Sequence, residues 1–147
     1  MSVLNRLVAG PPQAGHRISV VRLDGTETVE LPELWAMAGR VAAGLRERGV
    51  GPGDRIGVVA RNCLEWVLLD LAALRLKAIS AGFEPGSVKP GAALAADYEL
   101  RLVFTDEPAG EPGVLPIAEV RAMASTASMS DIEPVAYAPA PTPTGAD

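Results

Sequence analysis

Three short runs rich in branched or small apolar residues recur along the middle of the chain, at residues 55–60, 78–83 and 102–105. Helix-like segments at 64–76 and 90–98 separate these runs. Continuous apolar strands are typical of parallel sheets that helices cover on both faces, because the crossover between parallel strands is usually a helix. The alternation therefore predicts an α/β fold with a mostly parallel, doubly wound sheet and flanking helices.

A β-hairpin is expected ahead of this sheet. Residues 18–23 and 26–31 alternate in character, and Asp24-Gly25 between them is a typical two-residue hairpin turn. Pro32 suits the first turn of the amphipathic helix that follows, and Gly49 suits its end. The predicted order is therefore hairpin, helix, and then strands alternating with helices.

The helix at 64–76 is apolar on nearly every side, which predicts that it is sandwiched between other elements. Asn62 is its expected N-cap, and Glu65 three residues later completes a capping-box pattern. The strand at 78–83 is expected to be buried and to end at residues 84–86.

Composition divides the chain into three parts. Residues 1–16 form a leader rich in proline and glycine. Residues 17–123 form the α/β unit, which is expected to end with a short strand at 114–117 and a helical turn at 118–123. Residues 124–147 are rich in proline, alanine and threonine and are expected to be a linker or a disordered tail.

Composition also argues against several classes of function. After residue 106 there are six acidic residues and one basic residue, and no cluster of Lys and Arg exists, so we expect no nucleic-acid partner. No apolar stretch approaches the roughly 20 residues of a membrane span, and no signal peptide is recognisable, so we expect a cytoplasmic location. Cys63 is the only cysteine, which excludes an internal disulfide and a metal site built from cysteines. No metal site is expected.

Several segments occur in an order that points to a known family. A helix over 34–45 is followed by the turn and strand Gly49-Val50-Gly51-Pro52-Gly53-Asp54-Arg55 to Ala60, and then by Arg61-Asn62-Cys63-Leu64-Glu65-Trp66. Phe83-Glu84-Pro85 closes the second strand, and Leu102-Val103-Phe104-Thr105-Asp106 forms the third. From about residue 17 to residue 106 the chain resembles the N-terminal segment of the adenylate-forming (AMP-binding) superfamily of acyl-CoA synthetases, nonribosomal adenylation domains and luciferases.

The resemblance implies an AMP-forming acid–thiol ligase, in which a carboxylate attacks ATP to give an acyl-adenylate and a thiol then takes the acyl group. ATP, magnesium and coenzyme A are implied for the complete enzyme, and no cofactor for this chain alone. The family's phosphate loop and its catalytic lysine would follow a linker like residues 139–147. We therefore expect the N-terminal part of a larger N-terminal domain, inactive alone.

The expected partner is the missing C-terminal part, on the same gene or on a second chain. An uncovered sheet edge would also favour self-association. The alternative is a non-catalytic short homologue that acts as a binding or scaffold module. An unrelated nucleotide-binding domain is a third interpretation, which the lack of a glycine fingerprint after any strand disfavours.

No catalytic residue is expected in this chain, but five residues are candidates for a substrate pocket. Arg61 and Asn62 follow the first buried strand, and Phe83, Glu84 and Pro85 follow the second. Ligands of open α/β sheets bind outside the carboxyl ends of the strands. Asn62 also suits a helix cap, and Glu84 also suits a solvated loop, so each has a structural alternative.

Other residues have a structural and a functional interpretation. The glycines of the 49–53 turn suit a helix-to-strand turn better than a phosphate site. Asp54 is expected to accept hydrogen bonds from backbone amides of its own turn. Cys63, beside a helix start, has either a lowered pKa or, as we favour, a packing role beneath Trp66. Lys77 stands where the family usually has glycine.

Overall fold

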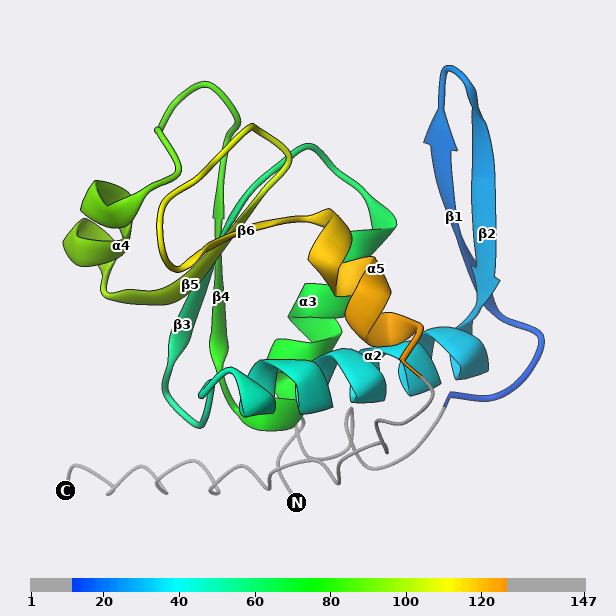
Figure 1. Ribbon diagram of the computed structural model, residues 1–147. Helices are drawn as coiled ribbons and strands as arrows, with labels where there is room; N and C mark the ends of the chain where they lie inside the picture. Colours follow the sequence, from blue (N-terminus) through cyan, green and yellow to red (C-terminus); the bar gives the residue numbers. More distant parts are fainter. Residues whose placement is uncertain (1–11, 127–147) are drawn as a thin grey trace, which may run out of the picture.

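The computed structural model describes residues 12–126. These residues form a four-stranded parallel sheet in the order β4-β3-β5-β6 and a separate two-stranded antiparallel hairpin, β1-β2. Helices flank the larger sheet, and the hairpin projects to one side of it (Figure 1). The predicted α/β class, with a parallel sheet preceded by a hairpin, is confirmed. Most of the predicted leader and of the predicted tail lies outside the described residues.

The hairpin consists of β1 (Arg17–Arg22) and β2 (Gly25–Glu30). Gly25 pairs directly with Arg22, so the two turn residues are Leu23 and Asp24. The predicted turn, Asp24-Gly25, is therefore wrong by one residue, because Gly25 already belongs to the second strand. At the base of the hairpin, the N–H of Leu31 donates a hydrogen bond of 2.9 Å to the carbonyl of His16.

Helix α2 (Leu31–Glu47) begins with proline in its first turn, as predicted. It ends before Gly49, which has a φ of +87° that favours glycine. The following turn leads into β3 (Arg55–Val59), whose last four residues are buried. Within that turn, the N–H of Gly51 donates to the Asp54 carboxylate at 2.8 Å, so the structural role predicted for Asp54 is confirmed.

Helix α3 (Leu64–Leu76) has the predicted bounds, but its cap differs. Cys63 is the N-cap, in extended backbone conformation, and its side chain makes no capping hydrogen bond. The prediction that Asn62 caps this helix is wrong, because Asn62 lies one residue before the capping position. The capping-box role of Glu65 is also wrong, since its carboxylate binds Arg121 instead.

The predicted sandwiching of α3 is confirmed, because α3 contacts β4 as well as α2 and α5. Its C-terminal turn is tied to α2 by a buried arginine. The Arg75 guanidinium lies 4.1 Å from the centre of the Trp35 ring and donates to the Trp35 carbonyl at 2.9 Å. This stacked geometry places Trp35 in a helix–helix interface.

Strand β4 (Ile79–Phe83) lies at an edge of the sheet and pairs only with β3. None of its residues is fully buried, and Ile79 is 49% exposed. The prediction that 78–83 is a buried strand is therefore wrong, because the strand lacks a second neighbour in the described residues. The remaining elements agree with the predicted order: α4 (Ala92–Tyr98), β5 (Leu100–Thr105), β6 (Val114–Pro116) and α5 (Ala118–Ala124).

Helices cover the two faces of the sheet unequally. The larger apolar core joins α2, α3 and α5 to one face and includes Val41, Ile56, Leu68 and Phe104. The smaller core joins α4 to the opposite face, around Val103. Figure 1 shows α4 apart from the other three helices. This two-sided covering is what defines a doubly wound sheet.

Candidate functional site

The sheet contains a point where the chain reverses its direction of winding. From β3 the chain passes to β4 on one side and then returns across β3 to β5 on the other side. The carboxyl ends of β3 and β5 lie next to each other at this point, because the two strands are parallel neighbours. Ligands of open α/β sheets bind in the crevice at such a switch point.

The five predicted pocket residues come together at this edge of the sheet. They line one open hollow of about 510 Å³ at the ends of β3 and β4, which we call the β4 hollow; its lining is Ala60, Arg61, Asn62, Trp66, Gly82, Phe83, Glu84 and Pro85. Two loops far apart in the sequence thus meet at one surface. Whether this surface binds a substrate stays a prediction.

Sequence reasoning missed Trp66 and Gly82 as parts of this hollow. A Cβ atom on Gly82 would lie 2.5 Å from a ring carbon of Trp66, so the indole of Trp66 packs directly on the strand backbone. A glycine inside a strand often marks such a close approach. The glycine at position 82, inside a predicted strand, was the signal that could have indicated this contact.

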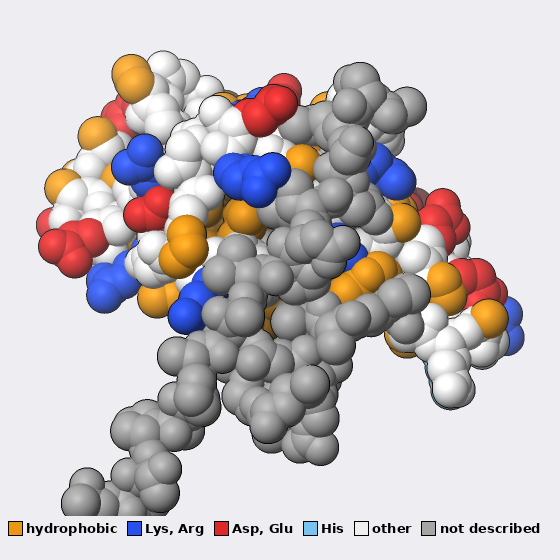
Figure 2. All heavy atoms as spheres, turned by 90° about the horizontal axis from the view of Figure 1, so that it is seen from below, with side chains coloured by type: hydrophobic (Ala, Val, Ile, Leu, Met, Phe, Trp, Pro, Cys, Tyr) orange, Lys and Arg blue, Asp and Glu red, His pale blue; other side chains and the backbone are white. Residues whose placement is uncertain are grey.

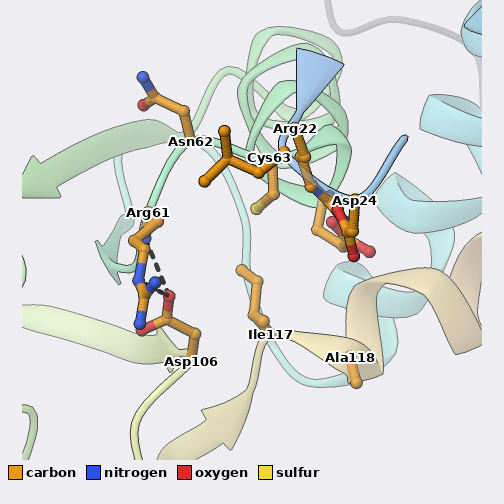
Figure 3. A pocket seen from close by; sticks show the side chains of 10 residues that line it. Arg22, Asp24, Arg61, Asn62, Cys63, Asp106, Ile117 and Ala118 are labelled. Atoms are coloured by element: carbon orange, nitrogen blue, oxygen red, sulfur yellow. Dashed lines mark hydrogen bonds and ion pairs between the residues drawn. The ribbon is translucent and has the colours of Figure 1, made fainter. Parts of the chain in front are cut away.

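A second hollow of about 570 Å³ lies at the switch point itself, between the hairpin tip, the start of α3 and the start of α5 (Figure 3). We call it the hairpin hollow; its lining is Arg22, Leu23, Asp24, Arg61, Asn62, Cys63, Glu65, Asp106, Ile117 and Ala118. Arg61 and Asn62 line both hollows. In Figure 3 the side chain of Arg61 extends toward Asp106, whereas that of Asn62 points away from it.

Polar contacts join the ends of β3 and β5. The Asp106 carboxylate accepts a hydrogen bond of 3.0 Å from the N–H of Arg61, and the Arg61 side chain approaches it at 4.0 Å. The buried Thr105 hydroxyl donates to the Val59 carbonyl at 2.9 Å and accepts from the N–H of Glu107 at 3.0 Å. These bonds fix the edge on which both hollows lie.

Cys63 lines the hairpin hollow and is half-buried. Burial raises the pKa of its thiol above the ordinary value, and this effect exceeds the opposing effect of nearby backbone amides. The alternative of a lowered pKa is therefore wrong. The thiol is in its neutral form at neutral pH, which disfavours a nucleophilic role.

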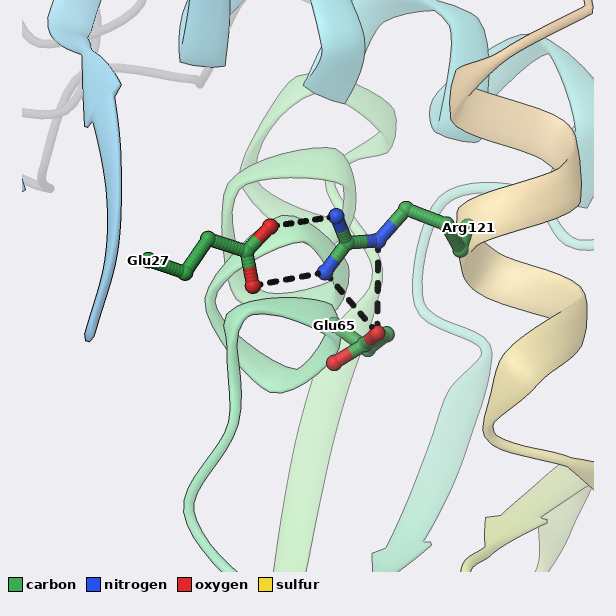
Figure 4. A network of polar contacts seen from close by, with 3 residues as sticks. All are labelled: Glu27, Glu65 and Arg121. Atoms are coloured by element: carbon green, nitrogen blue, oxygen red, sulfur yellow. Dashed lines mark hydrogen bonds and ion pairs between the residues drawn. The ribbon is translucent and has the colours of Figure 1, made fainter. Parts of the chain in front are cut away.

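Three charged residues from three elements meet beside the hairpin hollow (Figure 4). Arg121 of α5 donates to both carboxylate oxygens of Glu27 on β2, at 2.5 and 3.2 Å. The same guanidinium donates to Glu65 of α3 at 3.0 and 3.3 Å. The hydrogen bond from Arg121 lowers the pKa of the Glu27 carboxyl, and Glu27 in turn raises the pKa of Arg121. No pattern in the sequence indicated this cluster.

The glycine turn at 49–53 does not fit a phosphate site. It precedes β3 and therefore lies at the amino edge of the sheet, opposite both hollows. Its Gly51 N–H is already bonded to Asp54, and the Arg101 side chain lies against Gly49 and 4.0 Å from Asp54. Within residues 12–126, no group of three His, Cys, Asp or Glu side chains is arranged to hold a metal ion.

Among the described residues that are visible in Figure 2, acidic and basic side chains both occur, and the basic ones form no continuous area. The absence of a nucleic-acid partner stays a prediction. Among the helices in the described part of the chain, none has the length and apolar character that crossing a membrane requires.

Comparison with known proteins identifies a family. The AMP-binding enzyme family matches residues 9–145. A carboxylic acid reductase of Mycobacterium tuberculosis is 36% identical over 81 residues, which make up 54% of this chain and 7% of the reductase. A 3-oxocholest-4-en-26-oate–CoA ligase of Rhodococcus rhodochrous is 43% identical over 56 residues, or 38% of this chain and 10% of the ligase.

The fold also matches solved structures. A fatty acyl CoA synthetase of Mycobacterium tuberculosis superposes with a TM-score of 0.61 at 19% identity, over 76% of this chain and 25% of the synthetase. The chain thus spans a quarter of that structure, and still less of the two curated relatives. Because the family match extends over nearly all of its residues, the chain belongs to the AMP-binding enzyme family.

Proposed function

We propose that this chain forms the N-terminal part of an AMP-forming acid–thiol ligase. In the complete enzyme a carboxylate attacks the α-phosphate of ATP, giving an acyl-adenylate and pyrophosphate. A thiol, coenzyme A in the acyl-CoA synthetase type, then displaces AMP to form the thioester. The family match over residues 9–145 is the observation that carries this proposal.

The chemistry itself is assigned to residues beyond this chain. Transfer of a carboxylate onto phosphorus needs positive charge concentrated around the phosphates, from magnesium, lysine and backbone amides. Several arginines of the described part are engaged in pairs with carboxylates: Arg48, Arg55, Arg61, Arg101 and Arg121. ATP, magnesium and coenzyme A are accordingly proposed for the complete enzyme, and this chain alone is proposed to be inactive.

This part of the enzyme is proposed to form one wall of the substrate site through the β4 hollow. The support is geometric, because Arg61, Asn62, Phe83, Glu84 and Pro85 line one surface at the carboxyl edge of a doubly wound sheet. The surface combines the aromatic and apolar groups of Phe83 and Pro85 with polar groups of the other three. Such a mixture suits a ligand with an apolar body and a polar end.

The inactivity of the isolated chain is tested by ATP–pyrophosphate exchange. Purified 147-residue chain is incubated with ATP, magnesium, labelled pyrophosphate and a panel of aliphatic and aromatic carboxylic acids. We expect no acid-dependent label in ATP. Exchange above the no-acid background would contradict the assignment of the chemistry to residues beyond this chain.

The contribution of the β4 hollow is tested in a chimaera. Residues 17–123 replace the matching segment of an active acyl-CoA ligase, and thioester formation is measured beside circular dichroism of the same preparation. We expect an active chimaera in which Arg61→Gln or Glu84→Gln raises KM for the acid or the thiol. Lys89→Gln, outside both hollows, is the control. A folded chimaera with no activity, or with unchanged KM in both hollow variants, would contradict the proposal.

The short scaffold homologue remains the alternative function, and the missing C-terminal part or a second chain remains the proposed partner. The mass of the native gene product and the length of its reading frame separate the two functions directly. Self-association of the isolated chain is a further proposal, supported by the edge position of β4 and by the 49% exposure of Ile79. Sedimentation of a stable monomer at all concentrations would count against it. The cytoplasmic location stays a prediction.

A further inference from the structure

The walls of the hairpin hollow belong to the hairpin on one side and to the larger α/β unit on the other. Its outer wall is the hairpin tip, Arg22 to Asp24, and its inner wall is the loop and first turn from Arg61 to Glu65. The two-stranded hairpin shares no strand pairing with the four-stranded sheet. The distance between the walls is therefore set by whatever side chains join them, and not by a backbone ladder.

The hairpin is anchored in the core at its base, but not at its tip. Ile18, Val20 and Val29 pack against the larger core. Toward the turn, Val21 is 76% exposed and the Leu23 side chain is entirely exposed. The apolar contacts therefore reach along the hairpin as far as the pair Val20–Glu27, and leave the turn beyond it without apolar support.

Arg121 contacts the hairpin at the limit of that apolar support, through Glu27. The side-chain hydrogen bonds found between the hairpin and the rest of the described chain both run from Arg121 to Glu27. The same guanidinium binds Glu65, which lines the inner wall of the hollow. In Figure 4 the two carboxylates approach the guanidinium from β2 and from α3, so one side chain joins the strand that follows the hairpin tip to the inner wall.

These contacts are of a kind that can open. The three side chains are 35%, 36% and 16% exposed, for Glu27, Arg121 and Glu65 respectively, so the cluster is partly solvated. Ion pairs at partly solvated positions contribute little to stability, so thermal motion breaks them often. The bidentate geometry between Arg121 and Glu27 adds to the strength of this pair. Salt in the solvent weakens them further.

We propose that Arg121 is the latch of the hairpin hollow. While it holds Glu27 and Glu65 together, the hairpin tip closes the outer side of the hollow. When the Glu27 pair breaks, the part of the hairpin beyond Val20 swings away from α3, and the hollow at the switch point opens to solvent. Arg121 thereby controls access to the edge of the sheet where ligands of this architecture bind. The latch does not depend on the proposed ligase activity.

The chain carries its own reporter of opening, because Cys63 is its only cysteine and lines the hollow. The experiment measures the rate at which the neutral reagent 4,4′-dithiodipyridine modifies Cys63 in the full chain. Glu27→Gln removes the charge that Arg121 holds. Glu119→Gln is the matched control, since it removes a carboxylate of α5 that pairs with Arg48 at 3.5 Å and lies outside the hollow.

We expect Glu27→Gln to raise the modification rate about fivefold, the factor that corresponds to about 1 kcal/mol. Glu119→Gln should leave the rate at the wild-type value. Raising the salt concentration to about 1 M should accelerate the wild-type reaction toward the Glu27→Gln rate and leave that variant unchanged. If Glu27→Gln acted only by destabilising the whole fold, the modification rate would instead follow the free energy of unfolding, which is measured in urea for each variant.

Equal rates in the two variants would overturn the proposal, and so would a variant rate that follows global stability alone. Circular dichroism shows whether Glu27→Gln folds. If it does not fold, the salt dependence of the wild-type modification rate tests the proposal, because that measurement needs no substitution. A wild-type rate that does not change with salt would then reject the latch.

Discussion

The main-chain N–H of Arg61 donates a hydrogen bond of 3.0 Å to the carboxylate of Asp106. This bond joins the end of β3 to the end of β5, at the point where the winding of the sheet reverses. The Arg61 side chain adds little to it, because that side chain is 90% exposed and lies 4.0 Å from the carboxylate. The backbone bond therefore organises the loop on which both hollows depend.

Two replacements of Asp106 distinguish the contribution of its hydrogen bond to stability from that of its negative charge. Asp106→Asn keeps an oxygen that can accept from the Arg61 N–H, so its free energy of unfolding should stay close to the wild-type value. Asp106→Ala removes the acceptor and should lower the free energy of unfolding by about 1 kcal/mol. Urea denaturation of both variants measures the difference. Equal losses in the two variants would show that the charge, and not the bond, is what matters.

Gly82 and Trp66 should behave as a coupled pair. Gly82→Ala places a methyl group 2.5 Å from the indole and should destabilise the chain by about 1 to 3 kcal/mol. Trp66→Leu removes the obstructing ring, so the double variant should lose less than the sum of the two single losses. A double-mutant cycle in urea measures the coupling. Strict additivity would mean that the ring moves aside without cost.

Glu99 occupies a backbone conformation that disfavours a side chain. It caps α4 with a φ of 55°, in the left-handed region. Glu99→Gly should therefore stabilise the chain by about 0.5 to 1 kcal/mol, after the extra flexibility of glycine in the unfolded state is counted. Asp97→Gly, inside α4, is the control and should destabilise. A stability loss for Glu99→Gly would refute the expected relief of backbone strain.

The loss of stability at acidic pH should depend on Glu27. Its carboxyl has a lower pKa in the folded chain than the ordinary value of 4.5, so the folded state binds fewer protons than the unfolded state. The stabilisation is therefore present above about pH 4.5 and is lost as the pH falls through the folded pKa. Glu27→Gln should be less stable than wild type at about pH 7, and the difference should shrink as the pH falls below 4.5 and through the folded pKa. Urea denaturation across this range provides the test.

The thiol of Cys63 should lose its proton only at high pH. Because burial raises the pKa of its thiol above 9.0, the rate of alkylation by iodoacetamide should have its midpoint above that pH. The same chain in concentrated urea should show the ordinary midpoint. The folded state keeps its proton longer than the unfolded state, so stability should also decline as the pH rises above 9.0. A midpoint below the one in urea would contradict the burial argument.

The predictions that relied on local sequence were accurate for element type and order. The apolar run at 55–60 became the buried strand β3, and the segment 64–76 became α3 with the same bounds. Pro32 and Gly49 marked the ends of α2 because their backbone preferences act within a single turn. The local sequence alone therefore indicates the hairpin, the helices and the strands.

Local reasoning failed where a neighbour in space decided the outcome. Asn62 has the right chemistry for a cap, but the helix begins one residue later, at Cys63. The strand 79–83 has a buried strand's composition, yet its place at the sheet edge leaves it half-exposed. The exposure of β4 follows from its position in the sheet, which the composition of the strand does not contain.

The sequence by itself determined the parallel α/β architecture, the family resemblance and five of the eight residues that line the β4 hollow, because strand periodicity and position after a strand are local properties. Only the tertiary structure decided that Trp66 packs on Gly82, and that Arg121 joins Glu27 to Glu65 across three elements. Glu27 and Arg121 lie 94 residues apart, and nothing in the spacing of charges indicates which pairs the fold brings within hydrogen-bonding distance.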